Sequence, residues 1–182
     1  MEELELEKTY LVKYLPDGLL MCEHKELLDI YIPESAKHPK LRIRQKGSKY
    51  EITKKTPLSE GDASQQTEQT IPLEESEFKS LMMVVGKRVL KTRYLYNYNG
   101  HVAEIDVFRD GLDGLVLVDF EFSTVEEMKS FEIPDFCLAD VTQEDFIAGG
   151  MLCGKKYSDI SEQLAKYKYN KILTKNRLFS IS

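Results

Sequence analysis

The sequence predicts a single antiparallel α+β domain, and three observations support this. Segments in which apolar and polar residues alternate outnumber segments with a helical repeat, and short turns join them. The helical segments are amphipathic, as expected of helices that cover one face of a sheet. At 182 residues, 42% of them hydrophobic, the chain has the length of one domain with a sizeable core. An open sheet and a closed barrel both satisfy this pattern.

The first half of the chain is predicted to consist mainly of strands. Residues 3–14 alternate with a period of two, so Glu5, Glu7 and Thr9 share one face of a strand. Lys8 lies on the opposite face, together with apolar residues. The further strands expected in this half cover residues 25–33, 41–46, 49–56 and 66–71.

Turn residues and one helix connect these strands. Gly47-Ser48 separates two of them and predicts a hairpin. Residues 57–65 are polar and contain Ser, Gly and Asp, which predicts a loop. Residues 73–85 repeat apolar side chains at i, i+3, i+4 and i+7, which predicts an amphipathic helix. The residues of this apolar stripe are Phe78, Leu81, Met82 and Val85.

Three more strands are predicted in the middle of the chain. Their alternation places them at about 87–97, 101–109 and 114–122. Asn99-Gly100 lies between the first two and is a strong hairpin signal, and Asp113-Gly114 marks the turn before the third.

Helices are predicted in the C-terminal third. Ser123 or Thr124 is expected to cap the first helix, because two glutamates follow in its first turn. The other two helices are expected from Thr142 with Asp145 to Gly149-Gly150, and at about 157–169.

Charge and composition exclude several classes of protein. The net charge of −6 disfavours nonspecific binding to nucleic acid. No stretch approaches the ~18 consecutive apolar residues of a membrane span, and the acidic N-terminal sequence lacks the apolar core of a signal peptide. The three cysteines lie far apart, so we expect a cytoplasmic protein with reduced thiols. We expect one domain over residues 1–182, with strands at about 3–122 and C-terminal helices at about 124–170.

Charged residues of one sign share one face of several predicted strands. The basic sets are Arg42 with Arg44 and Lys46, and Lys91 with Arg93; the acidic sets are Glu5 with Glu7, Glu104 with Asp106, and Asp119 with Glu121. Each strand alone fits an open antiparallel sheet whose charged face lies in water. Like charges on one face repel, however, so the whole set implies counter-charges elsewhere. A sheet that curls around its charged face, with helices on its apolar outer face, satisfies the pattern.

Such a closed sheet would enclose a tunnel lined with charge. Carboxylate pairs on neighbouring strands suit hard divalent cations such as Mg²⁺ or Mn²⁺. Arginines and lysines on other walls suit phosphate oxygens. A metal ion with basic side chains is what phosphoryl or nucleotidyl transfer requires. The residues therefore predict a site for a metal-bound polyphosphate.

The motifs resemble those of the CYTH superfamily, also called triphosphate tunnel metalloenzymes. Glu5-Leu6-Glu7-Lys8-Thr9 is similar to the family's ExExK element, with Thr9 in the place of the lysine. The other similar elements contain Arg42 and Arg44, Lys55, Glu68 between Gln66 and Thr70, Lys91 and Arg93, Glu104 and Asp106, and Asp119 and Glu121. The order and spacing of these elements over residues 3–122 carry the resemblance.

The resemblance implies an eight-stranded antiparallel β-tunnel, a closed barrel with helices packed outside, that binds a triphosphate and Mg²⁺ or Mn²⁺. It implies that Glu5, Glu7 and Glu121 hold one metal ion, and that Asp106 and Asp119 assist with a second or position water. The expected catalytic residues are Glu5, Glu7, Asp106 and Glu121, and the expected metal ligands are Glu5, Glu7, Asp119 and Glu121. The expected substrate-binding residues are Tyr31, Arg42, Arg44, Lys55, Lys91 and Arg93. Members of the family are often dimers, so a homodimer is expected.

The leading functional hypothesis is a metal-dependent hydrolase of inorganic triphosphate or a related organic triphosphate. The first alternative is a class IV-type adenylate cyclase, in which the ribose 3′-hydroxyl would attack the α-phosphate in the same site. The second is a non-catalytic domain that binds polyphosphate or nucleotide, which Thr9, Gln66 and Thr70 favour because they depart from the family pattern. The third alternative is a structural domain in which the charged face of the sheet lies in water. No nucleic-acid or membrane partner is expected.

Overall fold

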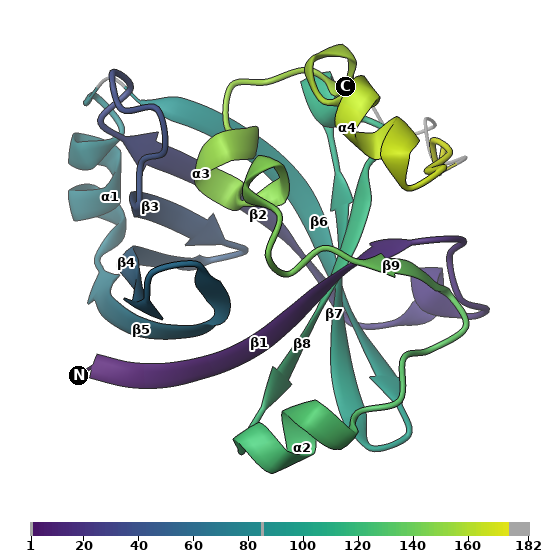
Figure 1. The fold of residues 1–182 in the computed structure, drawn as a ribbon. Helices are drawn as coiled ribbons and strands as arrows, with labels where there is room; N and C mark the ends of the chain where they lie inside the picture. The colour runs from purple at the N-terminus through teal and green to yellow at the C-terminus, as the bar shows by residue number, and fades with distance from the viewer. Residues whose placement is uncertain (1, 85, 175–182) are drawn as a thin grey trace.

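The computed structural model describes residues 2–84 and 86–174, in which nine strands form one antiparallel sheet (Figure 1). The strands are β1 (Glu2–Val12), β2 (His24–Ile32), β3 (Leu41–Lys46), β4 (Lys49–Ser59), β5 (Asp62–Leu73), β6 (Lys87–Tyr98), β7 (His101–Phe108), β8 (Val116–Phe122) and β9 (Cys137–Asp140). Their order is β5-β4-β3-β2-β6-β7-β8-β1-β9, and β5 also pairs with β1. The predicted closed eight-stranded barrel is therefore confirmed, with β9 as an added strand.

Strand β1 closes the barrel by changing partners along its length. Its first half pairs with β5, ending at Leu6 opposite Gln65, while the stretch from Leu6 to Leu11 pairs with β8. Beyond the contact with β5, β1 pairs with β9, for example Tyr10 with Asp140. This short strand was not expected from the sequence. It brings the C-terminal segment against the barrel.

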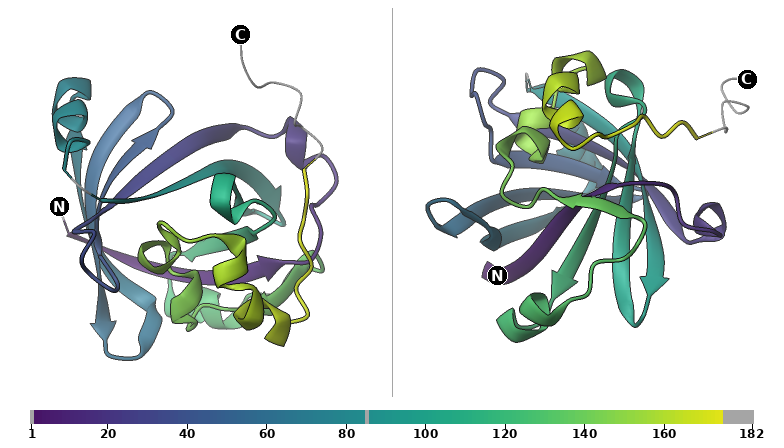
Figure 2. Two further views of the ribbon diagram at one scale, coloured as in Figure 1. Left: turned by 90° about the horizontal axis from the view of Figure 1, so that it is seen from above. Right: turned by 45° about the vertical axis from the view of Figure 1, so that its right-hand side comes forward.

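The α-helices lie on the outside of the barrel and beside one end of it (Figures 1 and 2). They are α1 (Glu75–Leu81), α2 (Val125–Ser130), α3 (Gly149–Leu152) and α4 (Ser161–Lys166). Short 3-10 helices cover Leu19–Met21, Asp110–Leu112, Asp145–Ile147 and Tyr157–Asp159. No helix in the described ranges has the length and apolar character needed to cross a membrane.

Two apolar cores lie between the outer face of the barrel and the segments that cover it. Under α1, Phe78 is buried against Ile30 of β2 and Ile43 of β3. Under α2 and the segment after it, Met128 and Phe136 belong to a larger core built on the outer faces of β1, β7 and β8. These contacts follow from strand alternation, which sends apolar side chains outward and charged ones inward.

A third core closes one end of the barrel. At this end, the inward side chains at the ends of five strands are apolar or aromatic rather than charged; they are Leu11, Tyr31, Val89, Phe108 and Leu117. Phe146, Ile147 and Leu152 from the C-terminal segment belong to the same core. Part of the interior is therefore core, and the charged space begins beyond it.

The first departure from the predicted elements is at residues 57–65, which were expected to be a loop. Strands β4 and β5 run almost through this stretch, and only Glu60-Gly61 turns between them, with Gly61 at φ 83°. Polar composition indicated a loop. Strand pairing, however, needs only backbone N–H and C=O groups, and of these residues only Pro57 lacks the N–H.

The helices predicted at 73–85 and 157–169 were right in place but wrong in extent, and the helix predicted to end at Gly149-Gly150 was wrong in place. The α-helix expected at 73–85 ends at Leu81, and Val85 lies outside the described residues. Thr124 caps α2 as expected, since its side chain accepts a hydrogen bond from the Glu127 backbone N–H at 3.1 Å. Gly149 begins α3 instead of ending a helix, and the helix expected at 157–169 is divided into a 3-10 turn and α4.

Candidate active site

The barrel encloses a cavity of about 760 Å³ whose wall is formed mainly by charged side chains. Every residue proposed from the sequence as catalytic, metal-binding or substrate-binding lines this cavity. Thirteen carboxylates and seven lysine or arginine side chains lie in its wall. An anion alone would meet excess negative charge there, so a polyanion needs accompanying cations.

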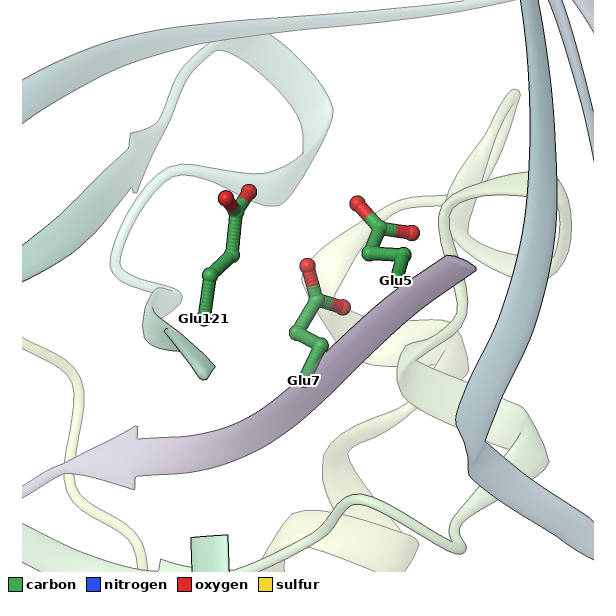
Figure 3. A group of neighbouring side chains, drawn as sticks. All are labelled: Glu5, Glu7 and Glu121. Atoms are coloured by element: carbon green, nitrogen blue, oxygen red, sulfur yellow. The ribbon is translucent and has the colours of Figure 1, made fainter. Parts of the chain in front are cut away.

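Three glutamates meet on one side of the cavity. Glu5 and Glu7 stand on the inward face of β1, and Glu121 stands on β8, where the register pairs it with Glu7. One carboxylate oxygen from each residue lies within 4.8 Å of the others (Figure 3). Carboxylate oxygens are the ligands that Mg²⁺ and Mn²⁺ prefer, so this group fits a divalent cation.

Lys55 of β4 lies beside these glutamates. Its ammonium forms a close ion pair with Glu5 and lies 3.8 Å from Glu7 and 3.5 Å from Glu68. Burial disfavours the charge on Lys55, but the carboxylates of Glu7 and Glu5 outweigh burial and raise its pKa. One lysine is therefore shared among three carboxylates.

Arg42 of β3 has few partners of its own. Its Nη1 donates a hydrogen bond of 3.4 Å to the Tyr31 hydroxyl, and Glu68 lies 4.0 Å from Nη2. Its Nε is buried and has no hydrogen-bond partner within the described part of the chain. The Tyr31 hydroxyl in turn packs against Gly149, where a side chain would have no room. We call Glu5, Glu7, Glu121, Lys55 and Arg42 the open cluster.

Arg44, the next inward residue of β3, is held differently. Its Nε and Nη2 donate to the two carboxylate oxygens of Asp29, at 2.5 and 2.7 Å. Asp29 lies directly opposite Arg44 on β2 and is 1% exposed. Burial alone would raise the pKa of Asp29, but the Arg44 guanidinium outweighs burial and holds that pKa well below its ordinary value. Asp29 is therefore ionised at neutral pH.

Arg93 of β6 repeats this arrangement. Its Nε and Nη2 donate to the two oxygens of Asp106, at 2.7 and 2.6 Å, and Asp106 lies directly opposite on β7. The ammonium of Lys91 also contacts Asp106, which is 1% exposed. Arg93 further contacts Glu104, and its Nη2 lies 3.1 Å from Asp119. We call Asp29, Arg44, Lys91, Arg93 and Asp106 the paired cluster.

Thr9 and Asp119 lie between the two clusters. The Thr9 hydroxyl donates to Asp119 at 2.8 Å, so Thr9 faces the cavity but contributes no charge. Burial, together with the charge of Glu7, raises the pKa of Asp119 to about 6 despite the nearby Arg93. Lys8 points to the other face of β1 and lines a separate surface hollow, so it does not replace the missing cation.

Two parts of the cavity wall were not expected from the sequence. Asp29 stands among the apolar residues of the second half of β2, and a lone buried acid of this kind requires a cationic partner. That signal was available, but the partner depends on strand register. The C-terminal segment also lines the cavity, and Thr142 accepts a hydrogen bond from the Thr9 backbone N–H at 3.1 Å. Gln143 contacts the start of β5, where its side chain accepts from the Ala63 backbone at 2.9 Å.

Comparison with known proteins agrees with this geometry. An inorganic triphosphatase of Nitrosomonas europaea is 34% identical over 142 residues, which are 77% of this chain and 90% of that protein. A solved structure of an inorganic triphosphatase is 29% identical, with a TM-score of 0.60 over 82% of this chain and 93% of that one. A solved Bacillus halodurans protein, 16% identical over 98% of this chain and 99% of that one with a TM-score of 0.54, shows likeness of fold alone. Residues 19–135 match the family model of the CYTH domain. This chain therefore belongs to the CYTH domain family.

Proposed function

We propose that this chain is a metal-dependent triphosphatase that hydrolyses inorganic triphosphate, or a related small triphosphate, inside the barrel. The observation that carries the proposal is the open cluster, in which three carboxylates suited to a divalent cation lie beside Lys55 and Arg42 in one enclosed space. The similarity to an inorganic triphosphatase of Nitrosomonas europaea supports the same reaction.

The chain would bind the substrate through lysine and arginine side chains that can add or exchange hydrogen-bond partners. The buried Nε of Arg42 has no partner in the described part of the chain, and a phosphate oxygen would satisfy it. Lys55 would exchange part of its contact with Glu5 and Glu7 for phosphate, because a metal ion on those carboxylates would supply their counter-charge. Arg44 would offer the Nη1 N–H groups that Asp29 leaves free. Arg93 would exchange its contacts with Glu104 or Asp119 for phosphate.

The metal ion would be Mg²⁺ or Mn²⁺, held by Glu5, Glu7 and Glu121, with Asp119 as a further candidate ligand. When bound, such an ion neutralises phosphate charge and polarises the phosphoryl group toward attack by water. Asp119 would orient the attacking water, since its carboxylate lines the cavity and is held by the Thr9 hydroxyl. The enclosed wall limits competing water and strengthens each electrostatic contact.

Phosphate release by the purified chain tests this proposal. We expect release from inorganic triphosphate with Mg²⁺ or Mn²⁺, none with a chelator, and strong loss in a Glu5→Gln/Glu7→Gln variant. ATP and thiamine triphosphate belong in the same panel. Cyclic AMP from ATP would favour the cyclase alternative, and tight triphosphate binding without turnover would favour a non-catalytic binder. Either result, or no release from any of the substrates, would overturn the proposal.

The cellular setting and assembly state stay predictions. Cys22, Cys137 and Cys153 are all free, which supports the cytoplasmic location expected from the sequence. Sedimentation of the purified chain would test the expected homodimer.

A further inference from the structure

The two ion pairs Arg44–Asp29 and Arg93–Asp106 have similar geometry. The first joins β3 to β2, and the second joins β6 to β7. In both, the aspartate stands directly opposite the arginine on a neighbouring strand. In both, Nε and Nη2 donate to the two oxygens of one carboxylate. In both, Nη1 is directed instead toward a glutamate of the cavity wall, Glu51 or Glu104.

In Arg44 this geometry uses one edge of the guanidinium and leaves another, whereas in Arg93 the remaining N–H groups also contact Glu104 and Asp119. A guanidinium carries five N–H groups in a rigid planar fork. Asp29 occupies Nε and Nη2 of Arg44, while Nη1 keeps both of its N–H groups and lies 3.9 Å from the nearest oxygen of Glu51. The free edge can therefore meet a phosphate while the aspartate fixes the plane of the fork.

We propose that Asp29 is a positioning residue: it holds the Arg44 guanidinium so that its Nη1 edge meets a phosphate of the substrate. Asp106 holds Nε and Nη2 of Arg93 in the same way, but there Glu104 and Asp119 contact the other N–H groups. The inference rests on the proposed triphosphatase function and assigns to it a residue outside the expected site.

Electrostatic attraction of the substrate does not explain an aspartate at position 29. Its carboxylate lies near Arg42 and Lys91 as well as Arg44, so it lowers the positive potential that attracts a polyphosphate. A buried ion pair is also weak support for stability, since a well-packed apolar pair often serves equally well. Fixing a long arginine side chain during folding, however, removes the rotamer entropy that binding would otherwise cost. The two hydrogen bonds from Arg44 to Asp29 would fix the arginine side chain in this way.

The sign of the effect of Asp29→Asn separates these roles. By charge alone, this substitution should tighten binding of inorganic triphosphate, because a negative charge disappears from the cavity. If Asp29 positions Arg44, kcat/KM should instead fall by about 10–100-fold. Glu51→Gln is the matched control: it removes a carboxylate near the same guanidinium that forms no hydrogen bond with it. The control should leave kcat/KM unchanged or raise it.

A double-mutant cycle with Arg44→Gln tests whether Asp29 acts through Arg44. We expect Asp29→Asn to cost little further activity once Arg44 is replaced. Thermal unfolding of each variant identifies an assay temperature at which all are folded. Asp29→Asn with wild-type or higher kcat/KM, or fully additive losses in the cycle, would overturn the inference.

Arg44→Lys covers the case in which Asp29→Asn does not fold. It keeps a cationic partner for Asp29 but cannot present two parallel N–H groups. We expect a similar loss of kcat/KM, and wild-type activity in this variant would overturn the inference. Calorimetry of wild-type protein with inorganic triphosphate and Mg²⁺ distinguishes failure of the proposed function from failure of the role proposed for Asp29. If the wild type neither binds nor hydrolyses it, the proposed function fails and the role of Asp29 with it.

Discussion

The open cluster and the paired cluster use the same kinds of side chain in opposite ways. In the open cluster, Lys55 is shared between Glu5 and Glu7 and also lies near Glu68. The buried Nε of Arg42 has no partner among the described residues. In the paired cluster, each arginine holds its own buried aspartate through two hydrogen bonds. Groups with unmet charge can accept a ligand, whereas an arginine held by its own aspartate is fixed in one orientation. We therefore expect the open cluster to govern activity and the paired cluster to govern stability and geometry.

The largest expected effect is on activity, from Glu121→Gln in the open cluster. Loss of a residue behind a metal ligand typically costs ~10–100-fold, so loss of a direct ligand should exceed about 100-fold. Glu121 is exposed, so the free energy of unfolding should change by no more than about 0.5 kcal/mol. Phosphate-release assays and urea unfolding check both parts. A folded variant with near wild-type activity would remove Glu121 from the metal site.

A large effect on stability is expected from Asp106→Asn in the paired cluster. This change leaves Arg93 and Lys91 buried without their shared carboxylate, which typically costs about 3–5 kcal/mol. Urea unfolding should therefore show a much larger loss of stability than for Glu121→Gln. Equal stability losses in the two variants would erase the distinction between the clusters.

The dependence of stability on pH offers a third test, in protein freed of metal. The pKa of Asp119 is raised to about 6, so the native state holds this proton more tightly than the unfolded state does. The free energy of unfolding should consequently fall, by about 1–3 kcal/mol, as the pH rises from about 4 through about 6. Asp29 and Asp106 have lowered pKa values, so their contribution persists across this range and is lost only in stronger acid.

Asp119→Asn is the matched variant for this pH test. It should flatten the decline between about pH 4 and pH 6, because the titrating carboxyl is gone. Melting temperatures of both proteins at several pH values provide the measurement. An identical slope in the variant would mean that another group causes the decline.

The smallest expected effect comes from Thr9→Lys, which adds a cation between the clusters. Thr9 faces the cavity beside Asp119, so a lysine there would extend into the space proposed for the triphosphate. An added charge contact of about 1 kcal/mol corresponds to a roughly fivefold lower KM for inorganic triphosphate. Lys8→Ala, on the opposite face of β1, should leave KM unchanged. A KM that rises in Thr9→Lys would argue against phosphate at this position.

Strand alternation predicted which face of each strand would line the cavity. Glu5, Glu7 and Thr9 share the inward face because the side-chain period of a strand is two, and that period is local. Which charges then meet depends on the register between strands that are distant in sequence. Asp29 was missed because its partner, Arg44, stands on another strand.

The C-terminal segment was least accessible to sequence reasoning. Its elements are short, and they are held by contacts with the barrel rather than by their own periodicity. Gly149, for example, begins α3 against the Tyr31 hydroxyl, a contact that no local pattern indicates.

The central claim is that the open cluster holds the metal ion while the paired cluster keeps its own contacts. A crystal structure with Mn²⁺ and a slowly hydrolysed triphosphate analogue, with manganese located by anomalous scattering, tests it most directly. We predict a manganese peak bound by Glu5, Glu7 and Glu121, with Asp29 and Asp106 still paired to Arg44 and Arg93. Manganese on Asp106, or none beside the three glutamates, would contradict the account.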